Sequence, residues 1–183
     1  MFSHRLVPAL ASVGLGGGIL FTAPLAREIY SGVSRSPTVP LSSPPSTPPP
    51  AQGALIGRLT VSRLSLDSAV LEGLEAGTLA RGAGHVPGTA LPGEERARRP
   101  SLIAFARGPA ASTIAGLRLG DRVRLTSASG PRRYRVVERR IGEPRQFRLD
   151  DDPGGHLTLI APFPPGFPGP APMRLAVVLK GRD

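Results

Sequence analysis

The sequence predicts an all-β fold, a closed β-barrel of about eight strands with short helices, preceded by one transmembrane helix. Three observations lead to this prediction. From residue 54 onward, short apolar or alternating runs are separated by Gly, Pro, Asp and Ser, which is typical of a domain built from many short strands. Residues 6–26 contain no charged residue. Between these two segments lies a stretch dominated by Pro, Ser and Thr.

The composition limits the chemistry that the chain can perform. Its 183 residues suffice for one domain of ordinary size together with a tail or an anchor. The sequence contains no cysteine, which excludes disulfides, thiolate metal sites and thiol nucleophiles. The consecutive acids Asp150, Asp151 and Asp152 have the composition of a calcium loop, but their side chains point in different directions and no EF-hand spacing is present. We therefore expect no metal and no cofactor.

The charge-free segment 6–26 is long enough to cross a bilayer as one helix, because about 20 apolar residues span the hydrocarbon core. It follows a short N-terminal segment, residues 1–5. Its prolines and its run of three glycines weaken a helix less in a membrane than in water. A cleaved signal peptide is the alternative, but Ala23 to Ala26 make a poor small-x-small cleavage site. We expect an uncleaved, single-pass signal anchor in the cell membrane, with the domain on the extracytoplasmic side.

Residues 27–53 form the predicted linker between the anchor and the domain. The part from 34 to 53 is rich in Pro, Ser and Thr, buries too little apolar surface to fold and favours an extended, partly polyproline II spacer. Its PxxP motifs also fit an SH3-type ligand, but a spacer is the simpler interpretation beside a membrane. The β-barrel domain then covers residues 54–183.

Alternation of apolar and polar residues locates the strands of the domain. A hairpin turns around Ser129 and Gly130, and Val123 and Leu125 on one strand face Tyr134, Val136 and Ile141 on the other, on the core side. The arginines at positions 122, 124, 133 and 135 then occupy the solvent side of this hairpin. The expected strands cover residues 54–61, 69–71, 101–106, 121–126, 132–140, 156–161 and 173–179, and a helix covers residues 76–81.

The net charge of +10 favours anionic neighbours such as phosphate-rich polymers, lipid headgroups or nucleic acid. The arginines are nevertheless scattered along the expected strands, with few aromatic residues between them on which bases could stack. We therefore expect no specific binding of nucleic acid.

One stretch resembles a signature loop of the class D and class E sortases, which are membrane-anchored cysteine transpeptidases of bacterial envelopes: LARGAGHVPGTALPG, residues 79–93. In this loop a short helix ends in glycine, a GHxxGT turn follows, and a PGE step leads to a buried strand. Upstream, IGRLTVSRLSLDSAVLEG (56–73) is similar to the opening strands of the family. Downstream, LRLGDRVRLT (117–126) is similar to the strand after its active-site helix. The resemblance covers nearly all of residues 55–180 and implies a sortase-like closed barrel.

Two further segments match the family without a gap and locate its catalytic positions. Residues 103–121, IAFARGPAASTIAGLRLGD, are similar to the block that holds the histidine, which falls on Ala106. Residues 157–174, LTLIAPFPPGFPGPAPMR, are similar to the block that holds the cysteine and the arginine, which fall on Pro162 and Arg174. The resemblance implies that a thiolate attacks the Thr–Gly carbonyl of an LPXTG-like sorting signal, a histidine protonates the leaving amine, and an arginine holds the oxyanion. Only Arg174 keeps the chemistry of its position.

No other side chain is expected to replace the missing groups. Thr158 precedes Pro162 by four residues, which is about 13 Å along a strand. The resemblance implies a structural role for His85 in the glycine-rich turn, whereas His156 begins a strand and His4 precedes the anchor. The resemblance therefore implies a catalytically inactive pseudo-sortase that retains binding of a sorting-signal-like peptide or surface protein. Two alternatives stay open: an active transpeptidase or hydrolase variant, and a non-catalytic scaffold or decaying copy.

Residues beside the catalytic positions are the predicted peptide-binding residues. Two of them, Phe163 and Phe167, belong to a stiff apolar loop and alternatively cap the core. Proline at position 162 has no backbone N–H, which removes one donor from the oxyanion site. The complete predicted set is Phe105, Ala161, Phe163 and Phe167.

Overall fold

A computed structural model describes residues 48–95, 99–147 and 155–182. The predicted transmembrane helix at 6–26, most of the linker and the acids at 150–152 lie outside these residues. No helix within the described residues is long and apolar enough to span a membrane. The strands are β1 Leu55–Val61, β2 Leu66–Glu72, β3 Ala83–His85, β4 Ser101–Ala104, β5 Arg122–Ser127, β6 Gly130–Gly142, β7 Leu157–Phe163 and β8 Met173–Arg182. The helices are α2 Ala76–Arg81 and α3 Pro109–Ala115, with short 3-10 turns η1 Ser62–Leu64 and η2 Pro144–Gln146.

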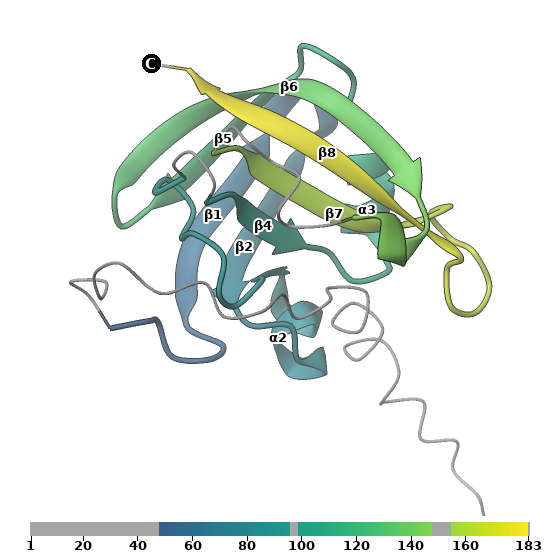
Figure 1. Ribbon diagram of the computed structural model, residues 1–183, viewed down its shortest axis with the longest axis horizontal. Helices are drawn as coiled ribbons and strands as arrows, with labels where there is room; N and C mark the ends of the chain where they lie inside the picture. Colours follow the sequence, from purple (N-terminus) through teal and green to yellow (C-terminus); the bar gives the residue numbers. More distant parts are fainter. Residues whose placement is uncertain (1–47, 96–98, 148–154, 183) are drawn as a thin grey trace, which may run out of the picture.

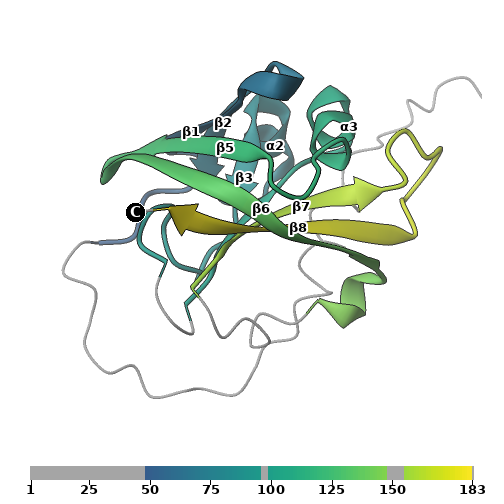
Figure 2. The ribbon, with the colours of Figure 1, turned by 90° about the horizontal axis from the view of Figure 1, so that it is seen from above.

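The strands join in one closed barrel in the order β1-β2-β3-β4-β7-β8-β6-β5, and β5 pairs back to β1 (Figure 1). Neighbouring strands are antiparallel except for the pairs β2–β3 and β4–β7, which are parallel. Figure 2 shows the barrel from above, where β6 and β8 cross the view side by side. This arrangement confirms the predicted all-β closed barrel with short helices.

Alternate residues of the strands fill the interior of the barrel, as a sheet closed on itself requires. Tyr134 and Val136 face this core as predicted, and α3 adds Ala111 and Ile114 to it. Every strand pairs on both sides and the core lies inside the barrel, so the segment 48–182 contains the pairing and packing that it needs to fold on its own. The largest fully buried core side chains are Phe105, Leu59, Ile103, Ile114, Leu117, Leu125, Leu157, Leu159, Leu175 and Leu179.

Ile141 lies opposite the core residue Leu175, but the prediction that it belongs to the core is wrong, because its side chain is 49% exposed. β5 pairs with β6 only as far as Arg135, whereas β6 continues alongside β8 to Gly142. The register of β6 against β8 also shifts between Val136 and Glu138. Ile141 therefore lies past the end of β5, beyond the closed part of the barrel.

A smaller apolar cluster lies on the outer face of the barrel wall, against α2. We call it the outer cluster; Ala106 and Ile160 are partly buried against it. Two of its members, Leu102 and Ala104, alternate along β4 with the core residue Ile103, which places them on the opposite side of the strand. The outer cluster consists of Leu74, Leu79, Val86, Leu102 and Ala104.

Candidate functional site

Two of the three positions that the resemblance assigns to catalysis are cross-strand neighbours. Pro162 on β7 is directly opposite Arg174 on β8. Ala161 and Leu175, which stand next to them along the strands, belong to the barrel core. Because neighbouring side chains of a strand point to opposite faces, Pro162 and Arg174 both belong to the outer face of the barrel wall.

Ala106 reaches the same place from β4. β4 pairs in parallel with β7, with Ala104 opposite Ile160. The amide of Phe105 donates to the carbonyl of Ile160 at 2.8 Å and continues the pairing beyond the end of β4. Ala106 lies two residues past the end of β4 and packs with Ile160 against the outer cluster, which places it on the side of the wall that also carries Pro162. The fold thus brings the three positions together, and two of them carry side chains with no polar atom.

Arg174 is bound to the backbone of the loop that precedes it. The residue is 7% exposed, and its Nη1 donates to the carbonyls of Ala171 at 2.9 Å and Met173 at 3.0 Å. A buried guanidinium is costly unless it is hydrogen-bonded, and these carbonyls supply acceptors. Arg174 therefore fixes the C-terminal end of the β7–β8 loop.

A second arginine binds the same loop from the connection between β4 and α3. Arg107 Nη2 donates to the carbonyl of Gly169. No pattern in the sequence indicates this contact, although Arg107 directly follows Ala106 in the matched block. Arg107 and Arg174 together tie the β7–β8 loop to the barrel at two points.

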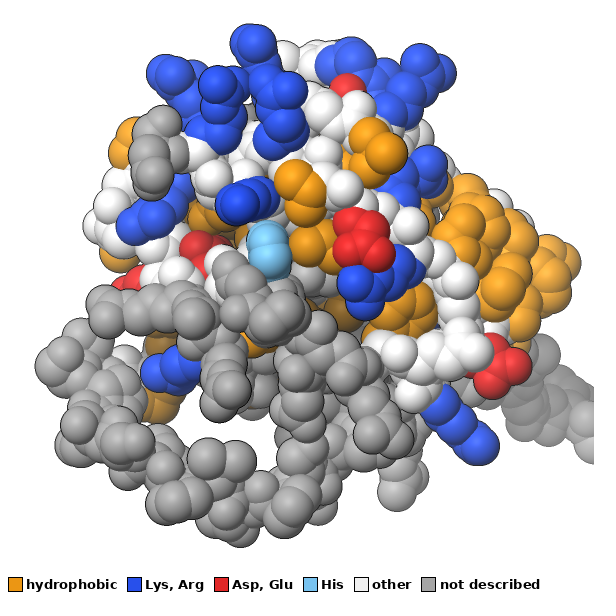
Figure 3. Space-filling model, turned by 45° about the horizontal axis from the view of Figure 1, so that its top comes forward, with side chains coloured by type: hydrophobic (Ala, Val, Ile, Leu, Met, Phe, Trp, Pro, Cys, Tyr) orange, Lys and Arg blue, Asp and Glu red, His pale blue; other side chains and the backbone are white. Residues whose placement is uncertain are grey.

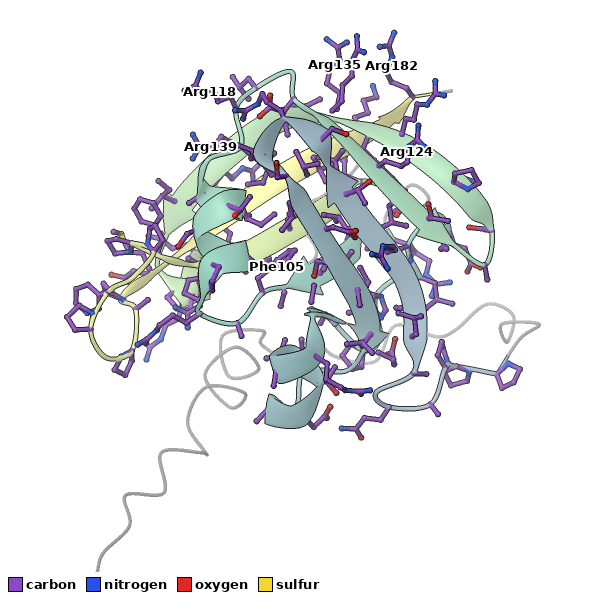
Figure 4. The ribbon with its side chains drawn as sticks, turned by 180° about the vertical axis from the view of Figure 1, so that it is seen from behind. Phe105, Arg118, Arg124, Arg135, Arg139 and Arg182 are labelled. Atoms are coloured by element: carbon purple, nitrogen blue, oxygen red, sulfur yellow. The ribbon has the colours of Figure 1, made fainter. Side chains whose placement is uncertain are left out.

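The predicted peptide-binding residues divide into two groups. Phe105 and Ala161 are each 1% exposed and belong to the barrel core, and Figure 4 shows Phe105 on the segment that joins β4 to α3. Phe163 is half-buried against the same core, which agrees with its alternative as a core cap. Phe167 is 38% exposed and is the most accessible of the four. Peptide binding by these residues stays a prediction.

His85 lies in a buried polar network at the end of β3. Its Nδ1 is 2.7 Å from Oε2 of Glu72, and its Nε2 is 2.9 Å from the carbonyl of Ala90 and 2.9 Å from Oγ1 of Thr89. A carbonyl can only accept, so Nε2 carries a proton and Nδ1 faces the carboxyl group. The parallel pairing of β2 with β3 sets Glu72 opposite His85. These contacts support the structural role that the resemblance implies for His85.

The remaining candidate side chains lie apart from the three positions. Thr158 is opposite Val178 on β8, four residues before Pro162. The backbone carbonyl of His156 accepts from the amide of Ser101 at 3.0 Å, at the beginning of β4. Among residues 48–95, 99–147 and 155–182, no group of three or more His, Cys, Asp or Glu side chains is arranged to hold a metal ion.

Solved structures of sortases are similar to this chain in fold. The crystal structure of Streptococcus agalactiae sortase C1 with MTSET matches 70% of this chain and 69% of its own, at 24% identity and a TM-score of 0.62. Sortase C-1 of Actinomyces oris matches 69% of this chain and 73% of its own, at 22% identity and a TM-score of 0.61. Sortase C-1 of Streptococcus pneumoniae matches 70% and 67%, at 23% identity and a TM-score of 0.62. No protein-family model matches the chain, and no curated protein matches it.

These likenesses show that the chain has the sortase fold. Within that fold, Ala106 and Pro162 stand where the resemblance expects a histidine and a cysteine, and Arg174 stands where it expects an arginine.

Proposed function

We propose that this chain is a pseudo-sortase of the class D or E type, a membrane-anchored protein of the bacterial cell envelope that binds a sorting-signal-like peptide without transferring it. The observation that carries the proposal is the pairing of Pro162 with Arg174 on the outer face of β7 and β8, with Ala106 two residues past the end of the adjacent strand β4. The gapless match of both sequence blocks supports the assignment of these positions.

The side chains at two of these positions cannot perform the chemistry. A methyl group and a pyrrolidine ring offer neither a nucleophile nor a proton donor, and position 162 also lacks a backbone N–H. Loss of a nucleophile or of its acid–base partner lowers turnover by roughly 10⁶ in a comparable triad. Arg174 keeps its charge, but its Nη1 binds the carbonyls of Ala171 and Met173.

Binding needs none of the missing groups. Ala106 and Ile160, which are only partly buried against the outer cluster, offer apolar surface, and Phe167 presents an accessible ring from the β7–β8 loop. Arg107 and Arg174 hold that loop to the barrel, which lowers the entropy lost when a ligand binds. In this proposal, the anchor and the linker keep the peptide-binding barrel at the outer side of the membrane.

A non-catalytic scaffold without a peptide ligand is the second candidate. The burial of Phe105 and Ala161 in the core favours it, because these residues then serve the fold alone. An active variant with another nucleophile is the third candidate, and it predicts a covalent acyl adduct when a peptide substrate is trapped.

The test is the binding of a fluorescently labelled pool of LPXTG-type peptides to residues 48–183, followed by fluorescence anisotropy. We expect saturable binding, and Phe167→Ala is expected to weaken it roughly tenfold because an apolar contact is lost. The matched control is Leu119→Ala, which removes another exposed apolar side chain outside the β7–β8 loop. Absence of saturable binding would favour the scaffold, and an acyl adduct in the mass spectrum would favour the active variant.

A further inference from the structure

Basic side chains form an ordered array on the outer face of β5, β6 and β8. Cross-strand pairing arranges them in two rows, each of which crosses the three strands in the order β5, β6, β8. Figure 3 shows Lys and Arg side chains gathered along the upper part of the molecule, and Figure 4 labels Arg124, Arg135 and Arg182 among them. The rows, which we call the basic face, are Arg122–Arg135–Lys180 and Arg124–Arg133–Arg182.

The basic face is not neutralised by acidic neighbours. Among the described residues, its members make no ion pair, whereas Arg58, Arg63 and Arg140 elsewhere on the barrel do. Arg135 is half-buried, and its Nε has no hydrogen-bond partner within the described part of the chain. Like charges at opposite positions of a sheet destabilise it. The arrangement therefore costs stability in the free domain, and a bound anionic surface would relieve that cost.

The shape and chemistry of the basic face fit a flat array of phosphates. Adjacent strands lie about 4.8 Å apart and alternate residues of one strand about 6.8 Å apart, so the six charges cover an area comparable to a few lipid headgroups. The one aromatic residue of the three strands is Tyr134, which is buried in the core. With no exposed ring for base stacking, the basic face does not have the features of a single-strand nucleic-acid site.

We propose that the basic face docks the barrel onto the anionic phospholipid headgroups of the membrane. The proposal rests on the proposed function in one respect, the anchor that brings the barrel near the bilayer. The predicted linker of residues 27–53 separates the predicted anchor from the barrel, and this separation would let the barrel turn its basic face toward the membrane. Docking then sets the orientation of the site formed by Ala106, Pro162 and Arg174.

The test uses residues 48–183, which lack the predicted anchor, and vesicles of phosphatidylcholine alone or mixed with phosphatidylglycerol. Co-sedimentation is expected with the mixed vesicles at low salt and is expected to be lost at high salt, because the contacts are screened. Removing one row with Arg124→Gln, Arg133→Gln and Arg182→Gln is expected to weaken binding roughly 100-fold. The control variant, Arg81→Gln, Arg99→Gln and Arg145→Gln, has the same net charge, and all three of its positions are exposed outside the basic face.

Each outcome decides the proposal. Equal loss in the two variants would overturn it, because net charge alone would then explain binding. Equal binding to both kinds of vesicle, or tighter binding to duplex DNA than to mixed vesicles, would also overturn it.

The row variant is expected to melt at the same temperature as the unmodified domain or higher, since it relieves repulsion. Arg122→Gln with Lys180→Gln provides an independent variant of the other row. Peptide anisotropy of the row variant is expected to be unchanged, so failure of docking is distinguishable from failure of peptide binding.

Discussion

Pro162 and Arg174 stand directly opposite each other on β7 and β8, at two of the positions that the resemblance assigns to catalysis. Arg174 is held in this place by the carbonyls of Ala171 and Met173, which belong to the fold and not to a substrate. These contacts give Arg174 a structural role in the β7–β8 loop.

The register of Pro162 against Arg174 is testable by cross-linking, because the chain has no cysteine of its own. Pro162→Cys with Arg174→Cys is expected to form a disulfide under mild oxidation, since opposite residues of a sheet have Cα atoms about 5 Å apart. Thr158→Cys with Arg174→Cys is the control and is expected to stay reduced, because Thr158 pairs with Val178 instead. Thiol counting under denaturing conditions measures both; a bridge in the control alone would show a different register.

The structural role of Arg174 predicts a loss of stability when its side chain is removed. Arg174→Ala leaves two carbonyls without their donor, and we expect the free energy of unfolding to fall by about 2–4 kcal/mol. Arg145→Ala, at an exposed position, is expected to change it by less than about 0.5 kcal/mol. Urea denaturation monitored by circular dichroism measures both variants. Equal stability of Arg174→Ala and the unmodified domain would contradict the role given to the guanidinium.

The buried pair of His85 and Glu72 predicts strong coupling between these residues. His85→Ala leaves a buried carboxyl group without its partner, and we expect a loss of about 3–5 kcal/mol in the free energy of unfolding. Removing both side chains is expected to cost less than the sum of the single substitutions. A double-mutant cycle from urea denaturation measures the coupling. Strictly additive losses would show that the two side chains do not interact.

Asp121 predicts a dependence of stability on pH. Arg63 Nε donates to its Oδ1 at 2.8 Å, and this contact holds the pKa of Asp121 below its usual value. A carboxyl group with a lowered folded pKa stabilises the fold above its unfolded pKa, and this contribution is lost as the pH falls through the folded pKa. Arg63→Gln is therefore expected to lower the urea midpoint near neutral pH, and its difference from the unmodified domain is expected to shrink in acid. A difference that grows in acid would contradict the assignment.

The alternation of apolar and polar residues predicted which side of a strand faces the core. Alternation along β5 and β6 correctly placed Tyr134 and Val136 in the core and the arginines of the hairpin on the outer face. The resemblance also assigned Pro162 and Arg174 to two catalytic positions within one block, and the pairing of β7 with β8 sets these two residues opposite each other. Ile141 is exposed and not buried as expected, because alternation does not reveal where a neighbouring strand ends, and β6 is longer than β5.

Short strands and single side-chain contacts could not be predicted, because they depend on tertiary contacts that leave no periodic pattern in the sequence. β3 has only three residues, too few for alternation to show, and it forms because it pairs with β2 and β4. Gly84 within it explains part of the glycine-rich signature: a Cβ there would lie 2.3 Å from the carbonyl oxygen of Gly73. The contacts of Arg107 and Arg174 with loop carbonyls join side chains to backbone atoms. Every residue has a backbone carbonyl, so no residue pattern in the sequence indicates which carbonyl an arginine binds.

The most direct test of the proposed inactivity is a turnover measurement by mass spectrometry on residues 48–183 with a pool of unlabelled LPXTG-type peptides and a glycine-based acceptor amine. A barrel with Ala106 and Pro162 at these positions is expected to release no cleaved or transferred product above the level of a heat-inactivated sample. Product above that level, formed in proportion to the amount of folded domain, would contradict the account.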